Sequence, residues 1–225
     1  MSDMSTSLNK FAEIETGEAF TLQNSRLLKV ELSATTVMAR SGAMVAYQGD
    51  VNFKHKGGGV GRMIKKAATG EGLRLMECNG TGEVFLANHA MLVHVVRLSN
   101  DSLTVSGENI LAFETGIDWD VTRVKGGATG MLAGGLFNIH LKGNGLVALL
   151  SDGEPIRLDV AEAPTFVDPQ AAIAWSGGVQ TSLKTDMQAK SFIGMGSGES
   201  IQLAMSGQGW VLVQPSEGRQ IVASK

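Results

Sequence analysis

A short pattern of alternating apolar residues around a Gly-x-Gly triplet occurs three times in this 225-residue chain. The second glycine of the triplet is Gly82, Gly145 or Gly209, so the copies lie 63 and 64 residues apart. On both sides of each triplet, apolar residues occupy every second position, which is typical of a strand with one buried face. Because glycine tolerates the positive φ angles of a tight reversal, we predict a β-hairpin at each triplet.

Each copy predicts the same folding unit: a strand, a turn, a strand that carries an aromatic residue, a long strand, a glycine-rich connection and the hairpin. The aromatic residues expected in this place are Tyr47, Trp119 and Trp175. A unit with one apolar face cannot bury that face alone, and repeats of this length therefore pack against one another.

The sequence therefore predicts a single all-β domain over residues 1–225, with internal repeats at approximately 20–88, 89–152 and 153–222. We expect three β repeats about a pseudo-threefold axis, forming a β-sandwich or barrel-like body with very little helix. The best helix candidate is the stretch 60–68, which is too short to be stable without packing.

Charge and cysteine content exclude several classes of protein. The net charge of −3, with both signs mixed along the chain, argues against nucleic-acid binding, which needs a basic surface. The single cysteine, Cys78, cannot form an intramolecular disulfide, which favours a reducing compartment, and we expect it to be a packed residue. We see no secretory signal, and the apolar runs are shorter than the ~20 residues that span a bilayer. We predict a cytoplasmic protein, with a peripheral position at the membrane as a variant of this prediction.

No pattern in the sequence predicts catalysis, a cofactor or a metal site. His89 and His94 are five residues apart, which places them on opposite faces of a strand and argues against a shared metal. No Gly-x-Ser-x-Gly elbow frames a nucleophile. Asp118 and Asp120 share one strand face and Trp119 points to the other, which favours a solvated face with a buried tryptophan behind it over acid-base chemistry. We therefore expect that the protein is not an enzyme and needs no cofactor.

Three glycine-rich connections, at 57–70, 126–135 and 191–198, occupy the same place in each repeat. The first is also basic, and glycine amides with lysine can hold phosphate, although the Gly-Lys-Ser/Thr sequence of a P-loop is absent. Apolar, methionine-containing loops favour contact with a partner if they are exposed, whereas the same side chains can instead cap the core. The candidate interaction residues are Gly59, Gly61, Arg62, Met63, Ile64, Lys65, Lys66, Met131, Leu132, Phe192, Ile193 and Met195.

Several short motifs carry a resemblance to a known family. They are Gly42-Ala43-Met44-Val45-Ala46, Gly57-Gly58, Gly70-Glu71-Gly72, Gly134-Gly135-Leu136-Phe137 and Ala174-Trp175. Together they resemble the altered-inheritance-of-mitochondria family, over a stretch from about Phe20 to Ile221. The resemblance implies a pseudo-threefold β-sandwich similar to the tryptophan-RNA-binding attenuator protein. It also implies a likeness to fungal proteins of the mitochondrial inner membrane that support membrane organisation, and it brings no catalytic residues.

Taken together, these observations predict a non-enzymatic interaction or scaffold protein. We expect it to form a homo-oligomer and to contact a protein partner or a membrane surface, and we expect no nucleic-acid partner. One alternative is a binding module for a small anionic ligand or phosphate at the Gly/Lys-rich loop 57–70. A further alternative is an enzyme of a kind that has not been characterised.

Overall fold

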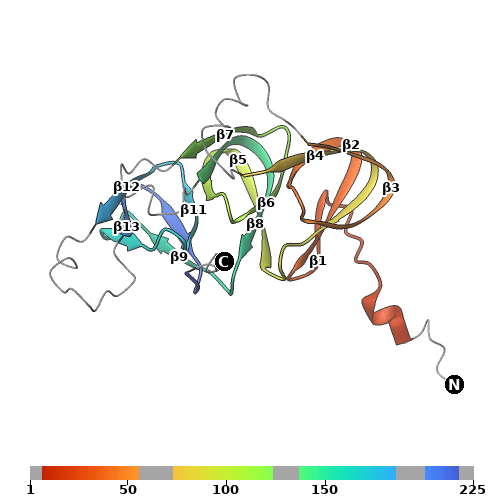
Figure 1. The fold of residues 1–225 in the computed structure, drawn as a ribbon, viewed down its shortest axis with the longest axis horizontal. Helices are drawn as coiled ribbons and strands as arrows, with labels where there is room; N and C mark the ends of the chain where they lie inside the picture. Colours follow the sequence, from red (N-terminus) through yellow and green to blue (C-terminus); the bar gives the residue numbers. More distant parts are fainter. Residues whose placement is uncertain (1–6, 56–72, 124–136, 186–200, 218–225) are drawn as a thin grey trace, which may run out of the picture.

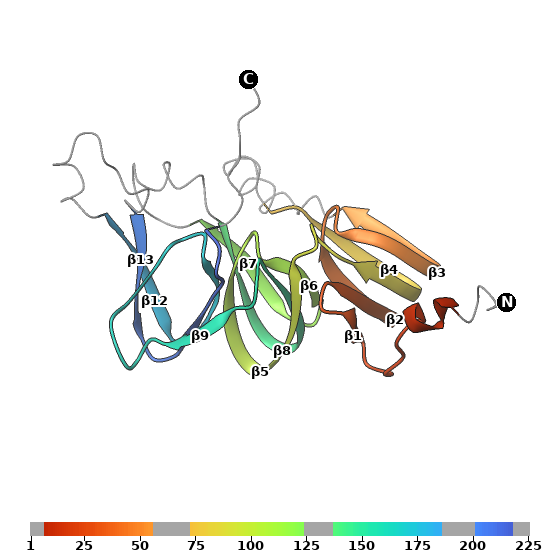
Figure 2. The same cartoon turned by 90° about the horizontal axis from the view of Figure 1, so that it is seen from below.

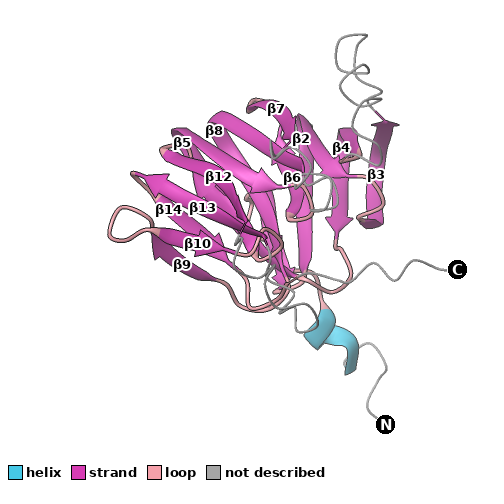
Figure 3. Cartoon of the chain, turned by 60° about the vertical axis from the view of Figure 1, so that its left-hand side comes forward, coloured by secondary structure: helices cyan, strands magenta, loops and turns pink. Residues whose placement is uncertain are grey.

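The structure is a computed structural model, and it describes residues 7–55, 73–123, 137–185 and 201–217 (Figure 1). The described secondary structure consists of antiparallel strands and one short 3-10 helix, η1 (Asn9–Phe11), as Figure 3 shows. The prediction of an all-β protein with very little helix is therefore confirmed. The strands are β1 (Phe20–Asn24), β2 (Leu27–Arg40), β3 (Met44–His55), β4 (Leu75–Leu86), β5 (Leu92–Ser106), β6 (Ile110–Glu114), β7 (Asp118–Arg123), β8 (Phe137–Ser151), β9 (Ile156–Asp159), β10 (Thr165–Val167), β11 (Ala172–Ser176), β12 (Val179–Thr185), β13 (Ile201–Gly207) and β14 (Trp210–Val213).

Most strands belong to one long sheet in the order β3-β4-β2-β6-β8-β5-β11-β14-β9, in which β1 also pairs with β2 and β7 with β8. A second sheet has the order β10-β13-β12. Because β3 and β9 are the two ends of the long sheet, this sheet is not closed, and the predicted barrel-like body is not formed by the described residues. Figure 2 shows three groups of strands side by side: β1–β4, β5–β8 and β9–β14. The pseudo-threefold axis stays a prediction.

The Gly-x-Gly triplets do not form hairpins, so this part of the sequence prediction is wrong. The first two triplets lie inside β4 and β8, and each strand keeps the same partner, β2 or β5, before and after its triplet. At the third triplet the chain passes from β13 in one sheet to β14 in the other. The glycines do have positive φ. They allow close approach of a neighbouring strand, because a Cβ on Gly80 or Gly82 would lie 2.1 Å from a backbone oxygen of β3.

The same pairing scheme occurs in three consecutive segments of the chain, formed by β1–β4, β5–β8 and β9–β14. The central strand of each segment is β4, β8, or β13 with β14. One flanking strand is β2, β5, or β9 with β10, and the other is β3, β6 with β7, or β11 with β12. A register shift recurs in the second flanking strand, between Met44 and Ala46, Ile110 and Ala112, and Ala172 and Ala174.

These pairings also show which aromatic residues correspond. Tyr47, Phe113 and Trp175 each lie opposite the valine two residues after the second glycine of the triplet. The prediction that put Trp119 in this set is wrong, because Trp119 lies on β7, opposite Leu141. The second segment has two strands, β6 and β7, where the first has only β3. Trp119 lies on the second of these strands, and for this reason its place in the sequence pattern suggested the wrong counterpart for Tyr47.

The apolar core crosses from each segment to the next. In one cluster, Leu28 and Val84 of the first segment pack with Leu111 of the second. In another, Val105 of the second segment packs with Ile173 of the third. A third cluster lies within the third segment, between its two sheets. Burial of apolar surface is the main favourable term in folding, so neighbouring segments stabilise one another.

Replacing a triplet glycine should destabilise the protein strongly. We expect Gly82→Ala to lower the free energy of unfolding by more than about 2 kcal/mol, because its φ of +144° is strained for alanine and the methyl group meets the Gln48 carbonyl oxygen. Gly116→Ala is the control, since no heavy atom lies within 4 Å of the added Cβ. Urea unfolding measures both variants. Equal stability of the two would contradict the assigned role of the triplet.

Candidate functional site

The loop residues predicted to bind a partner or an anion lie outside the described part of the chain. This holds for the stretch from Gly59 to Lys66, for Met131 and Leu132, and for the stretch from Phe192 to Met195. It also holds for the predicted helix at 60–68. These assignments stay predictions.

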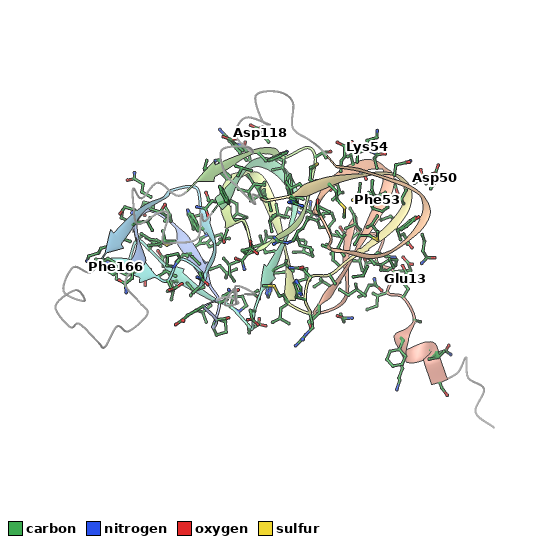
Figure 4. The ribbon with its side chains drawn as sticks, viewed as in Figure 1. Glu13, Asp50, Phe53, Lys54, Asp118 and Phe166 are labelled. Atoms are coloured by element: carbon green, nitrogen blue, oxygen red, sulfur yellow. The ribbon has the colours of Figure 1, made fainter. Side chains whose placement is uncertain are left out.

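Exposed apolar side chains gather at the two ends of the molecule. At one end, Met44, Val45 and Tyr47 are exposed at the start of β3, a terminal strand of the long sheet; we call them the β3 edge. At the other end, Ile156 and Leu158 of β9 are exposed together with Phe166 of β10; we call them the β9–β10 edge. Figure 4 shows Phe166 at one end of the ribbon and the β3 residues Asp50, Phe53 and Lys54 at the other. The remaining exposed large apolar residues of the described chain belong to the N-terminal part: Leu8, Phe11, Ile14 and Leu22.

Both edges expose backbone groups as well as apolar side chains. β3, β9 and β10 each have a strand neighbour on one side only among the described strands. Edge strands with unpaired N–H and C=O groups can pair with another chain, and proteins usually protect them with charge, proline or short length. β10 is short and has Pro164 before it and Pro169 after it. Its Phe166 ring lies 4.5 Å from the Lys184 ammonium, so one face of the ring is already in contact with a cation.

Lys29 on β2 is the only charged side chain that is buried among the described residues, with 1% of its side chain exposed. Its Nζ donates to carboxylate oxygens of Glu13, Glu15 and Glu83 at 2.8, 2.6 and 3.1 Å. Burial by itself lowers the pKa of Lys29, but the hydrogen bonds to the three carboxylates and the charge of Glu83 outweigh it and raise the pKa above its ordinary value. The ammonium therefore stays charged and ties the N-terminal segment to the sheet; Figure 4 marks Glu13 there.

The same three carboxylates could also hold a metal ion, since their oxygens lie within 4.8 Å of one another. The Lys29 ammonium, however, already contacts all three carboxylates. No local pattern in the sequence indicates this cluster, because Glu83 is 54 residues from Lys29 in the chain and meets it only through the pairing of β2 with β4. The cluster is therefore a structural clamp on the described N-terminal segment.

His94 and Ser151 form a close polar contact of 2.7 Å between Nε2 and Oγ. The Ser151 hydroxyl donates to the carbonyl oxygen of Gly153, at 2.7 Å, so His94 Nε2 is the donor to Ser151 Oγ. Burial lowers the pKa of His94, and the charge of Glu154 opposes this only in part. A neutral imidazole whose Nε2 donates a hydrogen bond to the Ser151 hydroxyl does not accept the proton of that hydroxyl. Ser151 and His94 are therefore not arranged as a nucleophile and its general base.

Cys78 is a packed residue of β4, as the sequence predicted. Burial raises the pKa of its thiol to about 11, and the charge of Glu77 adds to this effect. The thiolate is the reactive form of cysteine, so this thiol is inert at neutral pH. The predicted solvated face of β7 is also confirmed, because Asp118 and Asp120 are exposed on either side of the half-buried Trp119.

The fold defines an all-β protein of antiparallel sheets, with exposed apolar side chains at two strand edges and in the N-terminal segment. Residues 20–216 match the family model described as Mitochondrial biogenesis AIM24, so the chain belongs to the AIM24 family, and the resemblance found in the sequence is confirmed. The crystal structure of protein SPYM3_0169 from Streptococcus pyogenes is similar, with a TM-score of 0.70 and 20% identity over 88% of this chain and 92% of that chain. This likeness shows the fold alone. No curated protein matches the chain, and no helix within the described ranges is long and apolar enough to cross a bilayer.

Removing the buried cation should release the N-terminal segment. We expect Lys29→Met to lower the free energy of unfolding by about 1–2 kcal/mol, because three neighbouring carboxylates then lose their common partner and water screens only part of their repulsion. We also expect faster tryptic cleavage at Lys10. Arg97→Met is the matched control, since the Arg97–Glu18 pair is 3.9 Å long and exposed on both sides. A control as costly as Lys29→Met would contradict the clamp.

Proposed function

We propose that this protein is a non-enzymatic interaction and scaffold protein that self-associates through its strand edges. The observation that carries the proposal is the placement of exposed apolar side chains on terminal strands at opposite ends of the molecule. Apolar patches on an edge with free backbone groups favour pairing with another chain over exposure to water. The repetition of one pairing scheme in three segments supports a body made of three copies of one unit.

A structural role for the buried and partly buried polar groups supports the non-enzymatic part of the proposal. Lys29 is held by three carboxylates, His94 donates to a serine, and Cys78 is an inert buried thiol. Buried Asn109 and Gln214 bind one another at 3.2 Å. None of these groups is poised to transfer a proton or to attack a substrate. Anion binding at the loop 57–70 stays a prediction of the sequence.

A second proposed function is contact with a membrane surface. It would make the protein a cytoplasmic, peripheral membrane protein. It is favoured by the N-terminal segment, where Leu8 and Phe11 are exposed beside Lys10, whose Nζ lies 4.9 Å from the centre of the Phe11 ring. Apolar side chains with an adjacent cation suit the boundary between lipid headgroups and acyl chains. In Figure 1 this segment projects from the side of the molecule formed by β1–β4, away from β9.

Self-association predicts a defined increase in mass. In size-exclusion chromatography with light scattering, we expect the full chain to elute as a multiple of its 23.7 kDa. High salt should leave the mass unchanged, because the edges are apolar and salt weakens only charge interactions between exposed groups. A mass of 23.7 kDa at every concentration up to the solubility limit would refute self-association.

Membrane contact predicts flotation with liposomes. We expect the full chain to float with vesicles that contain anionic phosphatidylglycerol at low salt, and less with pure phosphatidylcholine, because Lys10 contributes an attraction that salt screens. The variant Phe11→Glu should lose most of the binding, whereas Tyr47→Lys should keep it, since Tyr47 lies on the β3 edge. Absence of flotation at low salt would remove this second function and leave self-association untouched.

A further inference from the structure

The following inference rests on the proposed self-association and names the partner and the pairing. Adjacent segments of the chain are already joined twice by one short antiparallel contact, which we call a joint. In the first joint β2 pairs with β6, and Met38 lies opposite Phe113. In the second β5 pairs with β11, and Thr104 lies opposite Trp175. Each joint therefore connects the first flanking strand of one segment to the second flanking strand of the next.

The two joints share their register as well as their polarity. In the first, Thr115 N–H donates to the Thr36 carbonyl oxygen at 3.2 Å, two positions along each strand from the Met38–Phe113 pair. In the second, Gly177 N–H donates to the Ser102 carbonyl oxygen at 3.0 Å, at the same offset from the Thr104–Trp175 pair. Two joints with the same bonds show that this contact is a regular property of the segment and not an accident of one pair of strands.

Among the described strands, each end of the molecule carries one unpaired half of the same joint. On the third segment, Phe166 of β10 lies opposite Ala204, three residues before the first triplet glycine. Met38 and Thr104 have the same relation to their central strands. On the first segment, Tyr47 is the counterpart of Phe113 and Trp175. The third segment thus has a free first half of a joint, and the first segment has a free second half.

Burial distinguishes these free halves from the paired ones. Phe113 and Trp175 are buried within the chain, whereas 51% of Tyr47 is exposed. Met38 is buried, whereas 47% of its counterpart Phe166 is exposed. Val45 is 59% exposed, whereas its counterparts Leu111 and Ile173 are buried. Ile156 is also 59% exposed, whereas its counterpart in the first segment, Leu28, is buried and its counterpart in the second, His94, is half-buried. The exposed residues of the two edges are therefore those that a third joint would cover.

We propose that β10 of one copy of this chain pairs with the start of β3 of a second copy, in the register of the two internal joints. Phe166 then lies opposite Tyr47, and the Gly49 N–H donates to the Pro164 carbonyl oxygen. Proline is suited to this place because the counterparts of Pro164, Thr36 and Ser102, use only their carbonyl oxygens in the joint. The contact is head-to-tail, so the copies form a ring where the rotation closes and a filament where it does not.

The other edge strands of the described sheets show which residues of β3 belong to the third joint. β7 and β12 correspond to the second half of β3, and neither has an outer neighbour within the described chain. Asp50 and Lys54, which Figure 4 labels on this half, are accordingly exposed. The third joint is therefore confined to the first few residues of β3 and to β10, and the apolar residues on either side supply the buried area.

Two single substitutions test the joint without disturbing the fold, because both side chains are exposed. We expect Tyr47→Lys and Phe166→Lys each to be a monomer of 23.7 kDa by light scattering. An equimolar mixture should give a dimer of twice that mass and nothing larger, because only one edge of each variant is intact. Asp50→Lys, on the second half of β3, is the matched control and should assemble as the unchanged chain does.

A pair of cysteines tests the register. The double variant Tyr47→Cys with Phe166→Cys should form a ladder of disulfide-linked chains on oxidation, because residues directly opposite in antiparallel strands have Cα atoms within the ~4.4–6.8 Å that a disulfide needs. Gln48→Cys with Phe166→Cys should form none, since Gln48 points to the other face of the sheet. The native Cys78 is buried and does not interfere.

The outcomes separate this inference from the proposed function. If the unchanged chain assembles but a folded single-lysine variant still assembles alone, or the mixture stays monomeric, the joint is wrong and self-association stands. A ladder from the Gln48→Cys pair would equally reject the register. If the unchanged chain is monomeric at every concentration, both proposals fail. Circular dichroism and thermal melting verify that each variant is folded.

Discussion

Close backbone contact at the first and third Gly-x-Gly triplets is the constraint on which the rest of the structure depends. At the first triplet, β3 approaches β4 so nearly that no Cβ fits, and at the third a Cβ on Gly207 would lie 2.5 Å from the Gly178 carbonyl oxygen. The absence of side chains there lets the central strand continue past its neighbours with the positive φ angles that only glycine adopts readily. The central strand of each segment positions the two flanking strands. The flanking strands in turn form the joints between neighbouring segments.

The segments depend on one another in the manner of repeat proteins, in which each repeat contacts only its neighbours and the terminal repeats expose what the inner ones bury. Leu111 and Ile173 are buried because a segment precedes each of them, and Val45 is exposed because its own segment is the first. The N-terminal segment, clamped through Lys29, covers another part of the first segment, and the side chains of the β3 edge stay exposed within the described ranges.

The polar groups of the described interior fix the fold and leave the strand edges as its distinctive surface. Lys29 keeps its charge because three carboxylates surround it, and His94 is held neutral by burial in contact with Ser151. Satisfied polar groups of this kind specify one arrangement of strands. Membership of the AIM24 family is consistent with this picture and assigns no reaction to the chain.

The sequence by itself determined the features that depend on local alternation: the all-β class, the three copies of the pattern, the packed Cys78 and the solvated face around Trp119. It did not distinguish a hairpin from a continuous strand at the triplets, because glycine at positive φ serves a tight turn and a close neighbour equally well. Nor did it show that Phe113 is the counterpart of Tyr47, that Glu83 meets Lys29, or which edges stay open. Alternation is set by the pleat of a single strand, whereas these features are set by which strands become neighbours, and only the tertiary structure decides that.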